Sequence, residues 1–138
     1  MGFIDVIKEK ARADKKTIVL PESMDRRTWV AAEKILKEDL ANLVIIGTPE
    51  DIGEHSSGLD VSGATIINPR TYEKTQEYID LFVELRKAKG MTEEKARETI
   101  LNDYAYYGCL MIKKGDADGM VSGACHSTAN TLRPCLQV

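Results

Sequence analysis

The densest group of chemically useful side chains lies in residues 118–137. This stretch begins as an apolar, strand-like run, continues as a loop of glycine, serine and threonine, and ends with an arginine and a proline at the start of a predicted helix. Parallel α/β proteins use such loops to hold anions, because backbone N–H groups and the positive end of a helix then face a phosphate. From the residues alone, a phosphate or nucleotide-phosphate site and an ordinary capped turn are equally good interpretations.

Several residues of this stretch suit a phosphate group. Gly123 permits a positive φ and a close approach of the backbone. Arg133 supplies a planar, permanently charged fork for phosphate oxygens, which a lysine would match less well. Pro134 is compatible with the first turn of a helix. The hydroxyl groups that could donate to phosphate oxygens belong to Ser122, Ser127, Thr128 and Thr131.

Other reactive side chains in the same region allow more than one interpretation. His126 lies between small residues, where it could act as a general base or fix the turn through a hydrogen bond. Neither Cys125 nor Cys135 has an identifiable activating partner, so the sequence does not predict an acyl-cysteine intermediate. Glu22 and Asp25 could form a paired-carboxylate site, but an acid at a strand end and a helix cap explain them adequately.

The elements that must position these residues alternate between strands and helices. Short apolar runs predict strands at 17–20, 43–46, 64–67 and 118–122. Periodic apolar residues and capping residues predict helices over 3–14, 25–39, 49–54, 71–89 and 92–114, the last with a break near residues 102–103. Alternating units with short connections predict a doubly wound, mainly parallel α/β sheet, whose ligands bind at the carboxyl ends of the strands.

Composition excludes several classes of protein. The 138 residues are 43% hydrophobic and fit one domain. A net charge of −3 argues against nonspecific binding of nucleic acid, which needs a clustered basic surface. No signal-peptide core is present, and no apolar run approaches the roughly 18 residues of a membrane span. Three cysteines without CxxC spacing argue against a disulfide framework and a structural zinc site, so we expect a cytoplasmic protein without a metal.

Residues 118–134 resemble the signature of the phosphate acetyltransferase (phosphotransacetylase) and phosphate butyryltransferase family. Further matches to that family are spread over the chain, at residues 19–22, 45–47, 68–72 and 85–87, and at Asp25, Arg27 and Gly90. The resemblance implies an isocitrate/isopropylmalate dehydrogenase-like fold of two α/β domains with the active site between them. It also implies that residues 1–138 are the N-terminal part of the first domain, without the second domain or the C-terminal segment that completes the first sheet.

The resemblance further implies a transferase of acetate metabolism, which interconverts acetyl-CoA and phosphate with acetyl phosphate and CoA. CoA is then a substrate, no cofactor is permanently bound, and the full-length protein is a homodimer. Arg86 and Arg133 match family positions associated with CoA and phosphate recognition. Without the resemblance, Arg86 is better explained as a solvated helix residue paired with a glutamate.

The mechanism that the resemblance implies depends on position and charge. The CoA thiol attacks the acyl phosphate directly, while arginines and loop N–H groups hold the phosphate. The base that deprotonates the thiol is expected downstream of Val138, so no catalytic residue is assigned. We expect the isolated chain to be inactive and incompletely stable, with an unpaired sheet edge and exposed apolar surface. Two alternatives stay open: a phosphate butyryltransferase, and a non-catalytic CoA-binding regulatory domain like that of some malic enzymes.

Overall fold

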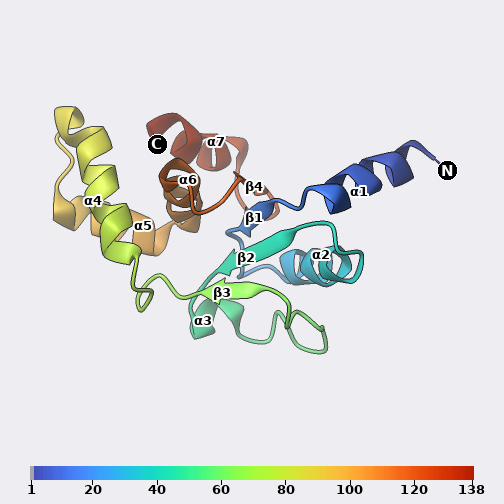
Figure 1. Ribbon diagram of the computed structural model, residues 1–138. Coiled ribbons are helices and arrows are strands. Elements are labelled where there is room, and N and C mark those ends of the chain that lie inside the picture. Colours follow the sequence, from blue (N-terminus) through green and yellow to red (C-terminus); the bar gives the residue numbers. More distant parts are fainter. Residues whose placement is uncertain (1) are drawn as a thin grey trace.

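Four parallel strands form the centre of the protein in the computed structural model, which describes residues 2–138 (Figure 1). They are β1 (Thr17–Leu20), β2 (Asn42–Ile46), β3 (Thr65–Ile67) and β4 (Gly119–Met120), in the spatial order β3-β2-β1-β4. Val19 of β1 lies opposite Val44 of β2 and Met120 of β4. The chain places two strands on one side of β1 and then returns to its other side. The order therefore reverses beside β1, and the predicted α/β class with a parallel sheet is confirmed.

Helices cover both faces of this sheet because successive strand residues point to opposite sides. On one face, Leu43 and Ile45 of β2 pack with Trp29 of α2 (Arg26–Lys37). On the other face, Val44 and Ile46 pack in the larger core. The helices of that core are α4 (Thr75–Arg86), α5 (Glu93–Asn102) and α6 (Tyr104–Lys114). The near-continuous burial of the central strands explains their apolar runs.

The predicted elements are present, and several of their bounds differ. The break predicted near residues 102–103 is confirmed, because the Asp103 carboxylate accepts from Ala105 N and starts α6. The helix predicted from residue 71 begins at Thr75, since Thr71 N and Tyr72 N donate to Asn68 O in a turn. It ends in a 3₁₀ turn, η1 (Lys87–Lys89), and the short helix α3 spans Pro49–Ile52.

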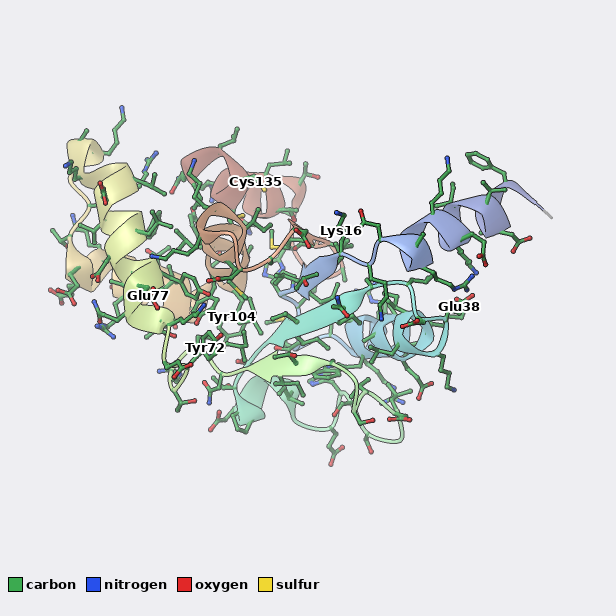
Figure 2. All side chains as sticks on the ribbon, in the orientation of Figure 1. Lys16, Glu38, Tyr72, Glu77, Tyr104 and Cys135 are labelled. Carbon is green, nitrogen blue, oxygen red and sulfur yellow. The ribbon has the colours of Figure 1, made fainter. Side chains whose placement is uncertain are left out.

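The first helix, α1 (Phe3–Ala13), projects away from the rest of the protein (Figure 1). None of its residues is buried, and Phe3 is 78% exposed. Its contacts are polar: Lys8 Nζ donates to Glu38 at 2.6 Å, and Arg12 Nε donates to the Glu38 backbone oxygen at 2.8 Å. Figure 2 labels Glu38 at this junction with α2. The amphipathic pattern predicted the helix, and the structure shows that its apolar face is exposed.

The last helix, α7 (Thr128–Gln137), starts earlier than predicted. Ser127 Oγ accepts from Asn130 N at 3.1 Å and caps it, so Pro134 lies inside the helix. The prediction of a helix starting at Arg133 and Pro134 is therefore wrong, and Arg133 stands on a formed helix. Among the described residues, no helix is long and apolar enough to cross a membrane.

Candidate functional site

The point where strand order reverses lies between the carboxyl ends of β1 and β4, and there the Glu22 carboxylate enters the loop that follows β4. Glu22 is only 2% exposed. Its Oε1 accepts from Gly123 N at 2.6 Å and from Ala124 N at 2.9 Å, and its Oε2 accepts from Cys125 N at 2.7 Å. Three successive N–H groups of the loop therefore converge on one carboxylate from a residue about a hundred positions earlier.

Side chains complete the shell around this carboxylate. Ser122 Oγ donates to Oε1 at 3.3 Å, while Cys125 Sγ and His126 Nδ1 lie 3.1 Å and 2.8 Å from Oε2. Burial alone would raise the pKa of Glu22, but the hydrogen bonds from Cys125, Ala124 and His126 outweigh it and hold the pKa well below its ordinary value. Burial and the adjacent Glu22 raise the pKa of the Cys125 thiol to about 12. The carboxylate is therefore ionised and the thiol protonated.

This arrangement corrects the expectation that the loop N–H groups hold a phosphate. The loop does form an anion-binding concavity, but the N–H groups of residues 123–125 already bind the protein's own carboxylate. Gly123 has a φ of 121°, so the predicted positive φ is confirmed. The signal that could have pointed to Glu22 was its position directly after a buried strand and a proline. From the sequence alone, that position is explained as an ordinary acid at a strand end.

Asp25 has the role that its position suggested. Its carboxylate accepts from Arg27 N at 2.9 Å and caps α2, and it pairs with the Arg27 guanidinium at 2.6 Å. Arg27 also donates to the backbone oxygen of Ala124. Glu22 and Asp25 are therefore not a paired-carboxylate site: Glu22 binds the loop after β4 directly, whereas Asp25 orients Arg27, which donates to that loop.

The structure brings most of the predicted loop residues around one cavity of about 230 Å³, lined by Ser122, Gly123, His126, Thr128, Thr131 and Leu132. Ser127 Oγ serves as the cap of α7, and Thr131 Oγ1 donates to the Ser127 backbone oxygen at 3.0 Å. Their hydroxyl groups are thus engaged in the first turn of the helix. Thr128 is exposed beside them.

Arg133 of α7 and Arg86 at the end of α4 both lie close enough to Tyr106 for their charges to act on its hydroxyl group. Burial, the largest cause, raises the pKa of Tyr106, and the positive charges of Arg133 and Arg86 act against this rise. Neither arginine forms an ion pair with a carboxylate of the described residues. The glutamate pairing considered for Arg86 is therefore not found, and Arg133 makes only a long contact of 3.4 Å with Asn130.

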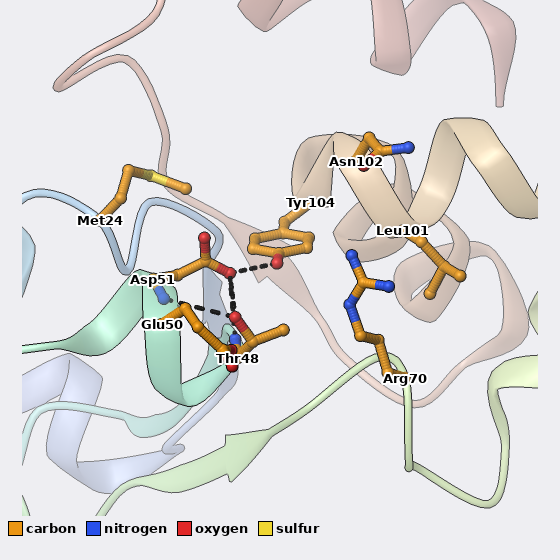
Figure 3. Close-up of a pocket in the computed structure, with 8 residues that line it drawn as sticks. All are labelled: Met24, Thr48, Glu50, Asp51, Arg70, Leu101, Asn102 and Tyr104. Carbon is orange, nitrogen blue, oxygen red and sulfur yellow. Dashed lines mark hydrogen bonds between the residues drawn. The ribbon is translucent and has the colours of Figure 1, made fainter.

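A larger polar pocket of about 540 Å³ lies beyond the ends of β2 and β3 (Figure 3). Asp51 accepts from Thr48 Oγ1 at 2.8 Å and from the Tyr104 hydroxyl. Arg70 extends towards Tyr104 from the other side. Burial and the bond to Asp51 raise the pKa of Tyr104 to about 12. Arg70 and Tyr104 were not predicted as pocket residues, because no local pattern brings residue 70 beside residue 104.

The ligand-like atoms of Glu22, Cys125 and His126 lie within 4.8 Å of one another, a spacing that a metal site would share. Hydrogen bonds account for this spacing, because both Glu22 oxygens accept from the loop and His126 Nδ1 lies 2.8 Å from Oε2.

Comparison with known proteins identifies the family. Residues 2–138 match the family model described as phosphate acetyl/butaryl transferase. The chain is 51% identical over 138 residues to the phosphate acetyltransferases of Thermoanaerobacterium thermosaccharolyticum and Acetivibrio thermocellus, and covers 42% and 41% of their lengths.

Solved structures agree with this match. A phosphotransacetylase from Streptococcus pyogenes superposes with a TM-score of 0.88 at 38% identity, over 100% of this chain and 43% of that one. The EutD phosphotransacetylase from Staphylococcus aureus gives a TM-score of 0.85 at 39% identity, over 98% and 41%. The chain thus spans less than half the length of the relatives that it matches. It belongs to the phosphate acetyl/butaryl transferase family.

Proposed function

We propose that the chain forms part of a phosphate acetyltransferase, which interconverts acetyl-CoA and phosphate with acetyl phosphate and CoA. The observation that carries this proposal is the family match over residues 2–138, together with 51% identity to two phosphate acetyltransferases. CoA is a substrate in this proposal, and no cofactor is permanently bound. The complete protein is proposed to be a cytoplasmic homodimer.

The same proposal makes residues 1–138 the N-terminal part of the first of two domains with an isocitrate/isopropylmalate dehydrogenase-like fold. Two features support it. The matched solved structures are more than twice as long as this chain, which covers 41% and 43% of them. The short strands β3 and β4 are the outer strands of the described sheet, and Val121 beside β4 is 64% exposed. Further chain would complete the sheet and close the cleft.

The phosphate end of the site is proposed to lie at the start of α7. Arg133 and Thr128 supply the charge and a free hydroxyl, and Arg86 adds a second charge for CoA or phosphate. The remaining loop residues shape this surface: Gly123 lets the chain turn around Glu22, and Ser122, Ser127 and Thr131 order the turn into α7.

The chemistry needs positioning more than a nucleophile of the protein. In the synthesis of acetyl phosphate, a phosphate oxygen attacks the thioester carbonyl. An oxygen–carbon bond forms, the carbon–sulfur bond breaks, and the proton that phosphate loses ends on the CoA sulfur. Holding both substrates removes much of the entropic barrier, and fixed positive charge stabilises the phosphate as it reacts. A high pKa keeps the Cys125 thiol protonated, which agrees with direct transfer rather than an acyl-cysteine.

The test is a fusion protein in which this chain replaces the segment that it matches in the Thermoanaerobacterium thermosaccharolyticum enzyme. We expect phosphate-dependent release of CoA from acetyl-CoA by the fusion and none by the 138-residue chain alone. Faster turnover of butyryl-CoA would instead favour a phosphate butyryltransferase. CoA binding by a folded but inactive fusion would favour the regulatory domain and refute the acetyltransferase.

A further inference from the structure

Resting on the proposed function, we infer that Glu22 is a positioning residue that fixes His126 so that its Nε2 atom contacts the phosphate bound in the adjacent cavity. Nothing in the family match requires this pair to work together. The inference depends on the hydrogen-bond pattern around one buried carboxylate and on the position of one imidazole ring.

The first step concerns the proton on Nδ1. The Glu22 carboxylate is ionised, so it can only accept hydrogen bonds. His126 Nδ1 lies 2.8 Å from Oε2 and must therefore donate. The ring thus carries its hydrogen on Nδ1 in the neutral form, and its Nε2 atom presents a lone pair.

The second step concerns how firmly the ring is held. Five other groups donate to the same carboxylate: the N–H groups of residues 123–125, Ser122 Oγ and Cys125 Sγ. Glu22 is 2% exposed and cannot swing away without leaving these donors unpaired. The carboxylate is thus fixed, and through Nδ1 it sets the orientation of the His126 ring.

The third step concerns where the opposite edge of the ring lies. His126 lines the cavity of about 230 Å³ together with Ser122, Thr128 and Thr131. Among the described residues, Nε2 has no hydrogen-bond partner, since each bond to this ring involves Nδ1. The side chain keeps 30% of its surface exposed. A free nitrogen and the Thr128 hydroxyl thus line one hollow, and Arg133 follows the lining residue Leu132 on α7.

The chemistry of this hollow suits phosphate that still carries a proton. A neutral Nε2 accepts a hydrogen bond from the P–OH group of monohydrogen phosphate, while the Thr128 hydroxyl donates to an unprotonated oxygen. These two contacts distinguish the protonated oxygen from the others. His126 would therefore select the orientation of phosphate, with Arg133 supplying most of the attraction.

The experiment uses the fusion protein, in which only the segment of this chain carries ¹⁵N-labelled histidine, followed by NMR while inorganic phosphate is added. The chain contains two histidines, so His55 is an internal control. Its Nδ1 lies 2.7 Å from the Ile52 carbonyl oxygen, which also requires the Nδ1–H form. We expect both rings to show Nδ1–H. Phosphate should shift Nε2 of His126 and leave His55 unchanged.

Three variants separate the roles. Glu22→Gln should release His126 from the Nδ1–H form and weaken phosphate binding about tenfold, the effect of one charge-assisted hydrogen bond. His126→Gln should weaken it by a similar factor and tests the contact even if the Glu22 variant fails to fold. Asp80→Asn changes an exposed acid of α4 that accepts from Gln76 and does not contact the loop of His126, so it should change neither property.

The outcomes distinguish this inference from the proposed function. A dominant Nε2–H form of His126, or phosphate binding that leaves His126 and its Gln variant unaffected, would overturn the inference while leaving an active fusion protein intact. An inactive fusion protein would refute the transferase. The inference is supported only by a response of His126 that depends on Glu22.

Discussion

At the scale of the residue, the contact between the end of β1 and the loop after β4 depends on one carboxylate. Glu22 accepts from three successive backbone N–H groups of the loop, and these hydrogen bonds hold its carboxylate ionised. Loss of the negative charge should therefore loosen the whole turn that leads into α7. Residues 123–126 and the first turn of α7 depend on it for their position.

Glu22→Gln should lower the free energy of unfolding at neutral pH by about 1–3 kcal/mol. At least one N–H group of the loop would then face the amide NH₂ group, which cannot accept a hydrogen bond. The pKa of Glu22 is lower in the folded state than its ordinary value of 4.5, so its stabilisation is present above that pH and is lost as the pH falls below it. Urea unfolding should show the gap between wild type and variant narrowing from pH 6 to pH 3. A difference in unfolding free energy that stays constant over this pH range would contradict the lowered pKa of Glu22.

The sequence predicted the place of this loop and the positive φ of Gly123, since glycine, hydroxyl residues and a strand end are local signals. It did not predict that the Glu22 carboxylate binds the N–H groups of the loop. The partners are about a hundred residues apart, and no local pattern couples them. The start of α7 was misjudged for a related reason: Arg133 and Pro134 drew the prediction to a later point, while Ser127 supplied the actual cap.

At the scale of the element, Glu22 is positioned because β1 and β2 end side by side. Gly47 follows β2 and lies against Ser23, which follows β1. A Cβ atom on Gly47 would stand 2.8 Å from Ser23 Cβ, closer than real side chains approach. The sequence marked Gly47 only as the end of a strand. Its packing role appears once the two strands are aligned in register.

Gly47→Ala should therefore destabilise the protein by about 1–3 kcal/mol, the usual effect of overpacking. Gly63→Ala is a matched control, because its nearest neighbour is the flexible side chain of Leu36 at 3.3 Å. The midpoint of urea unfolding should fall clearly for the first variant and little for the second. Equal midpoints would show that the ends of β1 and β2 are packed more loosely than described.

At the scale of the whole molecule, the sheet and its two helical layers were predictable, since alternating apolar runs and capped helices determine a parallel α/β fold. What covers the remaining apolar surface was not. Phe3, Ile4 and Ile7 of α1 are exposed, as are Leu132 and Leu136 of α7, so the expected exposed apolar surface is confirmed. The chain spans 42% of the length of its relative from Thermoanaerobacterium thermosaccharolyticum.

The central claim is that α7 and the loop before it form the phosphate end of an acetyltransferase site. The most direct test is the Michaelis constant for phosphate in the active fusion protein carrying Arg133→Ala. Arg97→Ala is the matched control, because Arg97 pairs with Glu93 on α5. We predict that Arg133→Ala raises this constant about 10- to 100-fold, as for the loss of a charged hydrogen bond, while Arg97→Ala leaves it unchanged. Unchanged constants for phosphate and acetyl-CoA in the Arg133 variant would contradict the claim.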